Sequence, residues 1–165
     1  MTYTIERKER CFEPIGSLLI RNLIVPHIYY QESLLGQCID VIAIDRAGTS
    51  DFHAVCVYDN LKQALDKGIS NMLSIPAHYR WVAFQGEGIY PKETIQQNLL
   101  ELQQNQKILF PESGMGRVGV IEIVRMYHND LGANVRIKAE RFKLNADTLQ
   151  RIDQFVKATE PDKKL

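Results

Sequence analysis

The sequence has few cysteines, and their arrangement would neither bind a metal nor cross-link a fold. Its three cysteines, Cys11, Cys38 and Cys56, are widely spaced and include no C-x-x-C pair, which argues against a zinc site or a disulfide framework. Free thiols of this kind are usually buried and persist in a reducing compartment. No apolar run approaches the ~20 residues that span a bilayer, and the polar N-terminus lacks the apolar core of a secretory signal. We therefore expect a cytoplasmic protein that does not associate with membranes.

The sequence also has no excess of charge of either sign. Lysine and arginine together number 20, aspartate and glutamate together number 20, and the formal net charge is +0. Nucleic-acid binding usually requires a basic excess or a basic face. The composition therefore gives no overall electrostatic argument for such binding, although it leaves a local basic patch open.

Several catalytic motifs are missing as well. No serine lies in a G-x-S-x-G elbow, which argues against a triad hydrolase. The histidines show no H-x-x-x-H spacing, so the sequence does not indicate a zinc peptidase. Gly114-Met115-Gly116 lacks the GK[ST] ending and precedes a predicted strand, which excludes a P-loop and leaves a turn as the simpler interpretation.

What the sequence does contain is an alternation of apolar segments that is typical of a single α/β domain. At 165 residues, the chain has the length of one domain. We place this domain at residues 1–158 and expect the charged tail, 159–165, to fray. Helical spacing predicts helices at 13–24 and 61–73, and from about 91 and 145 onward, whereas apolar runs and alternation predict strands at 27–34, 37–46, 52–58, 81–84, 118–124 and 134–142.

Two of the predicted strands, 37–46 and 52–58, are apolar on both faces. Strands of this kind are central strands covered by helices on both sides. The helix that joins 52–58 to 81–84 predicts a right-handed crossover between two parallel strands. The fold class that follows is α/β, with a mixed central β-sheet flanked by helices.

The order of these elements resembles the core of the restriction-endonuclease-like, or PD-(D/E)xK, nucleases. In that family a first helix supplies a Glu, a hairpin supplies an Asp, and the next strand carries an acid, any residue and then Lys. Asp40, in CIDVIAID, matches the hairpin Asp, and Glu13 matches the helix Glu. Cys56 and Tyr58 stand where the acid and the Lys are expected. The resemblance therefore implies a restriction-endonuclease-like core with a degenerate active site.

The resemblance also implies what an intact site would need. Magnesium prefers hard oxygen ligands, which a thiol does not supply, and a phenol carries no positive charge at neutral pH. Catalytic groups can migrate to the following helix in this family. If cleavage survives, the resemblance assigns Asp40, Glu13 and Lys62 to catalysis and Asp40 and Asp59 to Mg²⁺, with Glu32 as a further carboxylate. If cleavage does not survive, no cofactor is expected.

Each of these residues also has an ordinary structural role. Asp40 can be a turn residue at a strand end, and Glu13 a first-turn acid favoured by the helix dipole. Asp59 or Asn60 can cap the helix that follows. Cys56 can fill a small space in the core, and Tyr58 can lie at the core edge with its hydroxyl hydrogen-bonded.

Basic residues make the stretch from 117 to 143 locally positive. Arg136 and Lys138 fall on the exposed face of one predicted strand, and Arg117 precedes the neighbouring strand. Such residues can contact a phosphate backbone, and they can equally form a solvated strand face.

Three functions stay open from the sequence. The first is a nuclease-like domain that has lost catalysis and binds nucleic acid, such as DNA, or a protein partner. The second is an active Mg²⁺-dependent DNA endonuclease with migrated catalytic residues. The third is an interaction module without a nucleic-acid role, for example one that forms a homodimer. The missing acid and Lys favour the first over the second, whereas the neutral charge favours the third.

Overall fold

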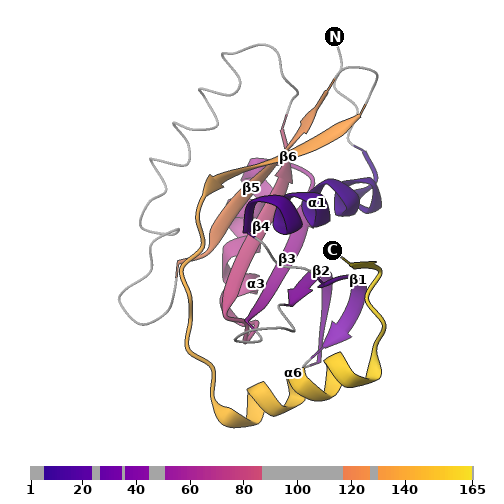
Figure 1. The fold of residues 1–165 in the computed structure, drawn as a ribbon. Helices are drawn as coiled ribbons and strands as arrows, with labels where there is room; N and C mark the ends of the chain where they lie inside the picture. The colour runs from indigo at the N-terminus through magenta and orange to yellow at the C-terminus, as the bar shows by residue number, and fades with distance from the viewer. Residues whose placement is uncertain are drawn as a thin grey trace.

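A computed structural model describes residues 6–23, 27–34, 36–44, 51–86, 117–126 and 130–164 (Figure 1). The elements in chain order are a short 3₁₀ helix η1 (Lys8–Cys11), α1 (Phe12–Leu23), β1 (His27–Leu34), β2 (Gln37–Ile44), β3 (Phe52–Tyr58), α2 (Leu61–Gln63), η2 (Ala64–Gly68), α3 (Ile69–Leu73), β4 (Tyr79–Gln85), β5 (Gly119–Arg125), β6 (Leu131–Ile137), α6 (Ala146–Ala158) and β7 (Lys163–Lys164). In the described part, no helix is long and apolar enough to cross a bilayer.

The strands form one mixed sheet in the order β6-β5-β4-β3-β2-β1-β7. β1 pairs antiparallel with β2, and β2 pairs antiparallel with β3, as a hairpin followed by a third strand. β3, β4 and β5 run parallel, and β6 returns antiparallel. The prediction that the two doubly apolar segments lie side by side is confirmed, as is the parallel pairing across the helix at 61–73.

Helices cover both faces of the sheet, as predicted. One face packs against α2, α3 and α6 and contains a core cluster with Tyr29, Phe52 and Phe84. The other face packs against α1 in a second cluster that contains Leu19 and Trp81. α1 contacts β1 and β2 as well as β6, which stand far apart in the strand order. The sheet therefore curls around α1, as Figure 1 shows.

The helical segment after β3 begins with a side-chain cap and contains a wide turn. The side chain of Asn60 accepts a hydrogen bond from the N–H of Gln63 at 2.9 Å, so Asn60, and not Asp59, is the N-cap. The middle of the segment, η2, is a π-helix. Gly68 ends it, and a Cβ at this position would lie 2.7 Å from the ring of Tyr58. The sequence predicted the helix but not this close approach.

The structure corrects two predictions in the last third of the chain. The strand predicted at 134–142 is instead β6, which ends at Ile137, and a β-bulge interrupts its pairing with β5 at Arg136. A bulge breaks the two-residue alternation on which the prediction was based. The tail predicted to fray instead forms β7, which pairs with β1 through Lys163 and Lys164. The helix predicted from residue 91 lies outside the described residues.

Candidate functional site

Asp40 lies within β2, at the point where β2 and β3 separate. The two strands pair as far as Val41 and Val55, and the next residue of β2 is Asp40. Its Oδ2 accepts a hydrogen bond from the backbone N–H of Val57 at 2.8 Å. The carboxylate thus accepts the bond that a backbone carbonyl would accept in a regular sheet. Because Asp40 lies inside β2, the alternative role of a turn residue at a strand end was wrong.

The hairpin is kinked at the level of Asp40. Gln31, which lies opposite on β1, has a φ of 51°, a conformation that is uncommon outside glycine. Ile39 and Ile42 belong to the same core cluster although they are three residues apart, and Val41 belongs to the other cluster. Side chains of a regular strand alternate between faces, so the kink turns the outer half of the hairpin over. The pairing between β2 and β3 therefore ends at the carboxylate of Asp40.

The second oxygen of Asp40 is occupied by a lysine from the chain's own N-terminus. The Nζ of Lys8 lies 3.0 Å from Oδ1 of Asp40. Asp40 is only 5 % exposed, whereas the Lys8 side chain is about half exposed. The hydrogen bond to Asp40 is the largest cause that raises the pKa of Lys8, against desolvation, which lowers it. Lys8 is therefore held as a cation on a buried carboxylate.

Lys8 belongs to an N-terminal strap, residues 6–11, that crosses the carboxyl ends of the parallel strands. The backbone of Glu6 exchanges two hydrogen bonds with the side-chain amide of Gln85, the last residue of β4. The carboxylate of Glu6 binds Arg125, the last residue of β5, at 2.9 Å and Arg10 at 2.6 Å. Ligands of open α/β sheets usually bind at these carboxyl ends. Here the strap covers them.

Cys56 and Tyr58 are packing residues at the positions where the resemblance expects an acid and a lysine. Both pack against the core cluster on the α2 side of the sheet. Burial raises the pKa of the Cys56 thiol to about 11, so it stays protonated at neutral pH. Burial also raises the pKa of Tyr58, although a hydrogen bond to the side chain of Asn71 opposes the shift. Neither side chain can replace a carboxylate or a cation.

Glu13 does not join Asp40. Its carboxylate forms an ion pair with Lys163 and accepts a hydrogen bond from the hydroxyl of Tyr30 at 3.0 Å. These two contacts lower the pKa of Glu13 against a smaller opposing effect of burial, the bond from Lys163 being the largest cause. Glu13 therefore connects α1 to β1 and β7. Its assignment to a shared catalytic site has no support in these contacts.

The remaining proposed ligands do not form a metal site. Asp59 and Lys62 are both exposed, at the start of the helical segment that follows β3. Glu32 is half-buried on β1 beyond the kink. Among the residues that the structure describes, no three His, Cys, Asp or Glu side chains are grouped so that they could hold a metal ion.

The proposed phosphate-binding residues are mostly engaged with acids. Arg136 lies 3.4 Å from the buried carboxylate of Glu122. Arg117 lies 3.3 Å from Glu140. Lys138 is exposed, but it follows β6 and does not share a strand face with Arg136 as predicted. These three residues therefore form no continuous basic face.

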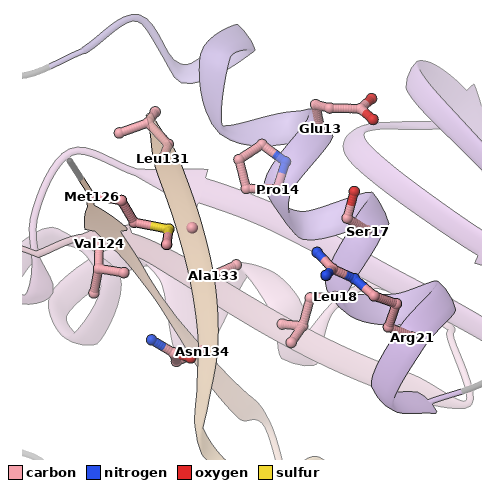
Figure 2. A pocket seen from close by; sticks show the side chains of 11 residues that line it. Glu13, Pro14, Ser17, Leu18, Arg21, Val124, Met126, Leu131, Ala133 and Asn134 are labelled. Atoms are coloured by element: carbon pink, nitrogen blue, oxygen red, sulfur yellow. The ribbon is translucent and has the colours of Figure 1, made fainter. Parts of the chain in front are cut away.

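A pocket of about 590 Å³ lies between α1 and β6 (Figure 2). Pro14, Ser17 and Leu18 of α1 form one wall, and Leu131 and Ala133 of β6 form the opposite wall. The lining is mixed in polarity, and of the described residues that line it, the polar ones, Glu13, Ser17, Arg21 and Asn134, are not buried.

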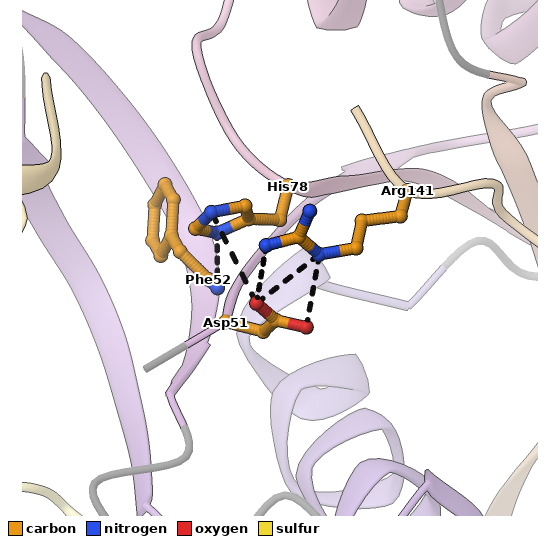
Figure 3. A network of polar contacts seen from close by, with 4 residues as sticks. All are labelled: Asp51, Phe52, His78 and Arg141. Atoms are coloured by element: carbon orange, nitrogen blue, oxygen red, sulfur yellow. Dashed lines mark hydrogen bonds and ion pairs between the residues drawn. The ribbon is translucent and has the colours of Figure 1, made fainter. Parts of the chain in front are cut away.

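A second polar network lies at the amino end of β3 (Figure 3). Nδ1 of His78 accepts a hydrogen bond from the N–H of Phe52 at 2.9 Å, and Arg141 binds Asp51 with its nearest contact at 3.0 Å. Desolvation lowers the pKa of His78, and the neutral ring is the form that can accept this bond. The network closes the start of a strand and lies at the end of β3 opposite Tyr58.

The strap is what the sequence interpretation missed. Lys8 and Asp40 are 32 positions apart, and the polar segment that contains Lys8 carries no motif. The closest signal was the density of alternating charges at residues 6–10, which is more often found on a solvated surface.

Comparisons with known proteins do not assign a family. No protein-family model matches the chain, and no curated protein matches it. Its fold is similar to that of a protein of unknown function from Silicibacter pomeroyi, with a TM-score of 0.47 and 11 % sequence identity over 96 % of this chain and 88 % of that chain. A likeness at this level supports no argument about function.

Proposed function

We propose that this chain is a nuclease-like domain that does not cleave phosphodiester bonds and acts by binding a partner. The kinship is supported by the order of hairpin, third strand, helix and parallel strand, which is the order that the family resemblance implies. The loss of cleavage is supported by one observation above all, which is the contact between Lys8 and Asp40.

The chemistry of the Asp40 carboxylate argues against a metal. One oxygen accepts the N–H of Val57 and the other binds the ammonium of Lys8. A Mg²⁺ ion would have to displace Lys8 and would then find one carboxylate beside a protonated thiol, whereas such ions require several oxygen ligands. The ammonium supplies in cis the positive charge that a metal would otherwise bring to the buried acid.

The distribution of charge favours a protein partner over nucleic acid. Arg117 and Arg136 already bind acids, and the formal net charge of the chain is +0. A surface that neutralises several phosphates needs several free cations on one face. Cys11, Cys38 and Cys56 are free thiols, which fits the cytoplasmic location that we also propose.

The cleavage test compares the wild-type protein with Asp40→Ala. Supercoiled plasmid is incubated with either protein in Mg²⁺ or Mn²⁺, and nicking is followed by gel. We expect no nicking above the buffer control by either protein. Metal-dependent nicking that disappears in Asp40→Ala would refute the proposal and restore the endonuclease interpretation.

The binding test measures duplex DNA affinity from low to physiological salt. We expect weak binding with a shallow dependence on salt, because few cations are available to release counterions. Lys138→Glu should change the DNA affinity and its salt dependence little. A steep dependence that Lys138→Glu reduces would instead establish a phosphate-contacting surface and make nucleic acid the partner.

A further inference from the structure

The two edges of the sheet differ in how they are protected. β7, at one edge, is two residues long, consists of Lys163 and Lys164, and follows Pro161. Short length, lysine and proline are the usual means by which an edge strand is kept from pairing with another chain. β6, at the other edge, has seven residues and contains no lysine or proline. Its one charged residue, Arg136, turns to the buried Glu122 of its own sheet.

β6 is accessible along its length. Six of its seven residues are half-buried and Asn134 is exposed, whereas six of the seven residues of β5 are buried. Within the described part of the chain, no strand pairs with the outer side of β6. Beside β6, Met126 is 49 % exposed, and its sulfur lies over Gly132, where a Cβ would approach it to 2.8 Å. An exposed apolar side chain, Met126, therefore lies beside the unpaired edge of β6.

The ends of β6 carry opposite charges. Asp130 precedes the strand and Lys138 follows it, and both are exposed. The described contacts include no ion pair for either residue. In an antiparallel pair of identical strands, the beginning of each strand meets the end of the other. Centred on Asn134, such a pair brings Asp130 of each copy to the end where Lys138 of the other copy lies, just past the bulge at Arg136, whereas a parallel pair would bring like charges together.

The centre of the strand suits the same pairing. With Asn134 at the twofold axis, Ala133 faces Val135 of the other copy, both on the α1 side of the sheet, and the axis repeats this pair. These are apolar pairs between half-buried side chains, and the two Asn134 amides can bond to each other across the axis. The bulge at Arg136 turns Ile137 to the face of the sheet opposite Leu131, so the regular ladder between the copies is limited to the residues around Asn134. The charges at the two ends favour the antiparallel direction.

From the charge complementarity and the unprotected edge, we propose that the partner is a second copy of this chain, joined through antiparallel pairing of β6 with β6. The inference deepens the proposed function, because it names the partner that the domain binds. The contact is isologous, so it closes as a dimer and does not continue into a filament. Leu131 and Ala133 also line the pocket against α1, so the pocket borders the joined edge.

The first experiment measures mass in solution by light scattering over a range of protein concentrations. The wild-type protein should reach twice the monomer mass. Asp130→Lys and Lys138→Asp should each weaken the dimer by about tenfold or more, because each places like charges together twice. The double variant Asp130→Lys/Lys138→Asp should recover the wild-type dissociation constant. Lys62→Glu, a charge reversal on an exposed residue of α2, is the matched control and should change nothing.

A cross-linking experiment fixes the geometry. Asn134→Cys in a Cys38→Ser background places one exposed thiol at the proposed twofold axis, while Cys11 stays buried. Mild oxidation should link two chains through position 134, and a cysteine introduced at the exposed Ser70 should link them far less. A monomeric wild type, or a dimer indifferent to both charge reversals, would overturn the inference. Neither assay contains DNA or metal. A negative result for dimerisation would therefore leave the proposal that the domain does not cleave DNA untouched, and a positive cleavage test would leave the dimer untouched.

Discussion

Asp40 is the residue on which most of the local structure around the candidate site depends. Its two oxygens are used by different parts of the chain, one by the amide of Val57 and one by Lys8. A buried carboxylate is costly unless it is hydrogen-bonded and paired, and here it is both. A nuclease would use an aspartate at this position to bind a metal. In this chain, Asp40 instead joins the strap to β2 and β3 where these strands separate.

Substitutions of Asp40 should separate its two contacts. Asp40→Ala leaves the buried Val57 amide without an acceptor and should lower the free energy of unfolding by about 2–3 kcal/mol. Asp40→Asn keeps an oxygen for that amide and should cost less. Lys8→Ala should cost about 1 kcal/mol, because the Lys8 side chain is half exposed and screened by solvent. Urea unfolding at neutral pH measures all three. An equal loss for Asp40→Ala and Asp40→Asn would contradict the role given to the amide.

His53 should make stability depend on pH. Burial lowers its pKa to about 4, with Asp51 opposing the shift and His78 adding to it, and its Nδ1 accepts a bond from the indole N–H of Trp81 at 3.2 Å. The unfolded chain takes up this proton near pH ~6.5, before the folded chain does. The stability contribution is therefore complete above that pH and is lost as the pH falls toward 4, by about 3 kcal/mol in total.

The matched variant for this titration is His53→Gln. Glutamine is uncharged throughout and should flatten the dependence between pH 6.5 and 4.5, measured by urea unfolding at each pH. Some slope should remain from His78, whose pKa is also lowered by burial. An unchanged slope in His53→Gln would show that His53 stays charged in the folded protein or that other groups dominate.

At the residue scale, the sequence indicated Asp40 but not its partner. An acid beside a continuous apolar run is visible in one sequence, and so is the absence of an acid and a lysine at Cys56 and Tyr58. The contact with Lys8 depends on where the strap crosses the sheet. No local preference determines that crossing, because it follows from the packing of α1.

At the scale of elements, the close approach between the π-helix and β3 should be intolerant of a methyl group. Alanine at position 68 gains about 1 kcal/mol in helix propensity over glycine. Its Cβ would nevertheless lie 2.7 Å from the Tyr58 ring and 3.0 Å from a methyl of Val82. We expect Gly68→Ala to be destabilising by about 1–3 kcal/mol. Ser70→Ala, on the exposed side, should be neutral or slightly stabilising, and thermal unfolding compares the two.

The C-terminal strand offers a matched pair of lysines. Lys163 binds Glu13 and lies 3.2 Å from the hydroxyl of Ser17, so it ties β7 to α1. Among the described contacts, the side chain of Lys164 forms an ion pair with the exposed Glu160 alone. Lys163→Ala should lower stability by about 1 kcal/mol and increase amide exchange in β7, whereas Lys164→Ala should stay within about 0.5 kcal/mol of wild type. Equal effects of the two substitutions would show that the contacts of Lys163 with Glu13 and Ser17 do not hold β7 to α1.

Elements were predictable where the pattern was continuous and strong. β1, β2, β3 and the helix after β3 were recognised from their apolar spacing, and their pairing followed from topology rules. β6 was misplaced because the bulge at Arg136 shifts the alternation. β7 was missed because two lysines give no strand signal, and the segment pairs only because Asp162 bonds to β1 through its side chain and its own N–H.

At the scale of the whole molecule, α1 holds the curled sheet together. It contacts β6 near one edge and β1 and β2 near the other, so its apolar face joins strands that do not pair with each other. Leu19 is fully buried in the cluster beneath α1, which also contains Trp81, the single tryptophan of the chain. If residues 1–158 fold as one domain, as the sequence predicts, loss of packing at α1 should weaken every strand together.

Leu19→Ala tests this dependence. We expect it to lower the free energy of unfolding by about 3 kcal/mol, because a fully buried leucine leaves a cavity when truncated. Trp81 fluorescence and far-ultraviolet circular dichroism should still report one coincident transition, since a single cooperative unit has no stable half. Leu149→Ala, at a leucine that is 39 % exposed on α6, is the control and should stay within about 0.5 kcal/mol of wild type. Two separated transitions in Leu19→Ala would mean that the hairpin β1–β2 and the parallel strands are stable without each other, and that α1 does not unite them.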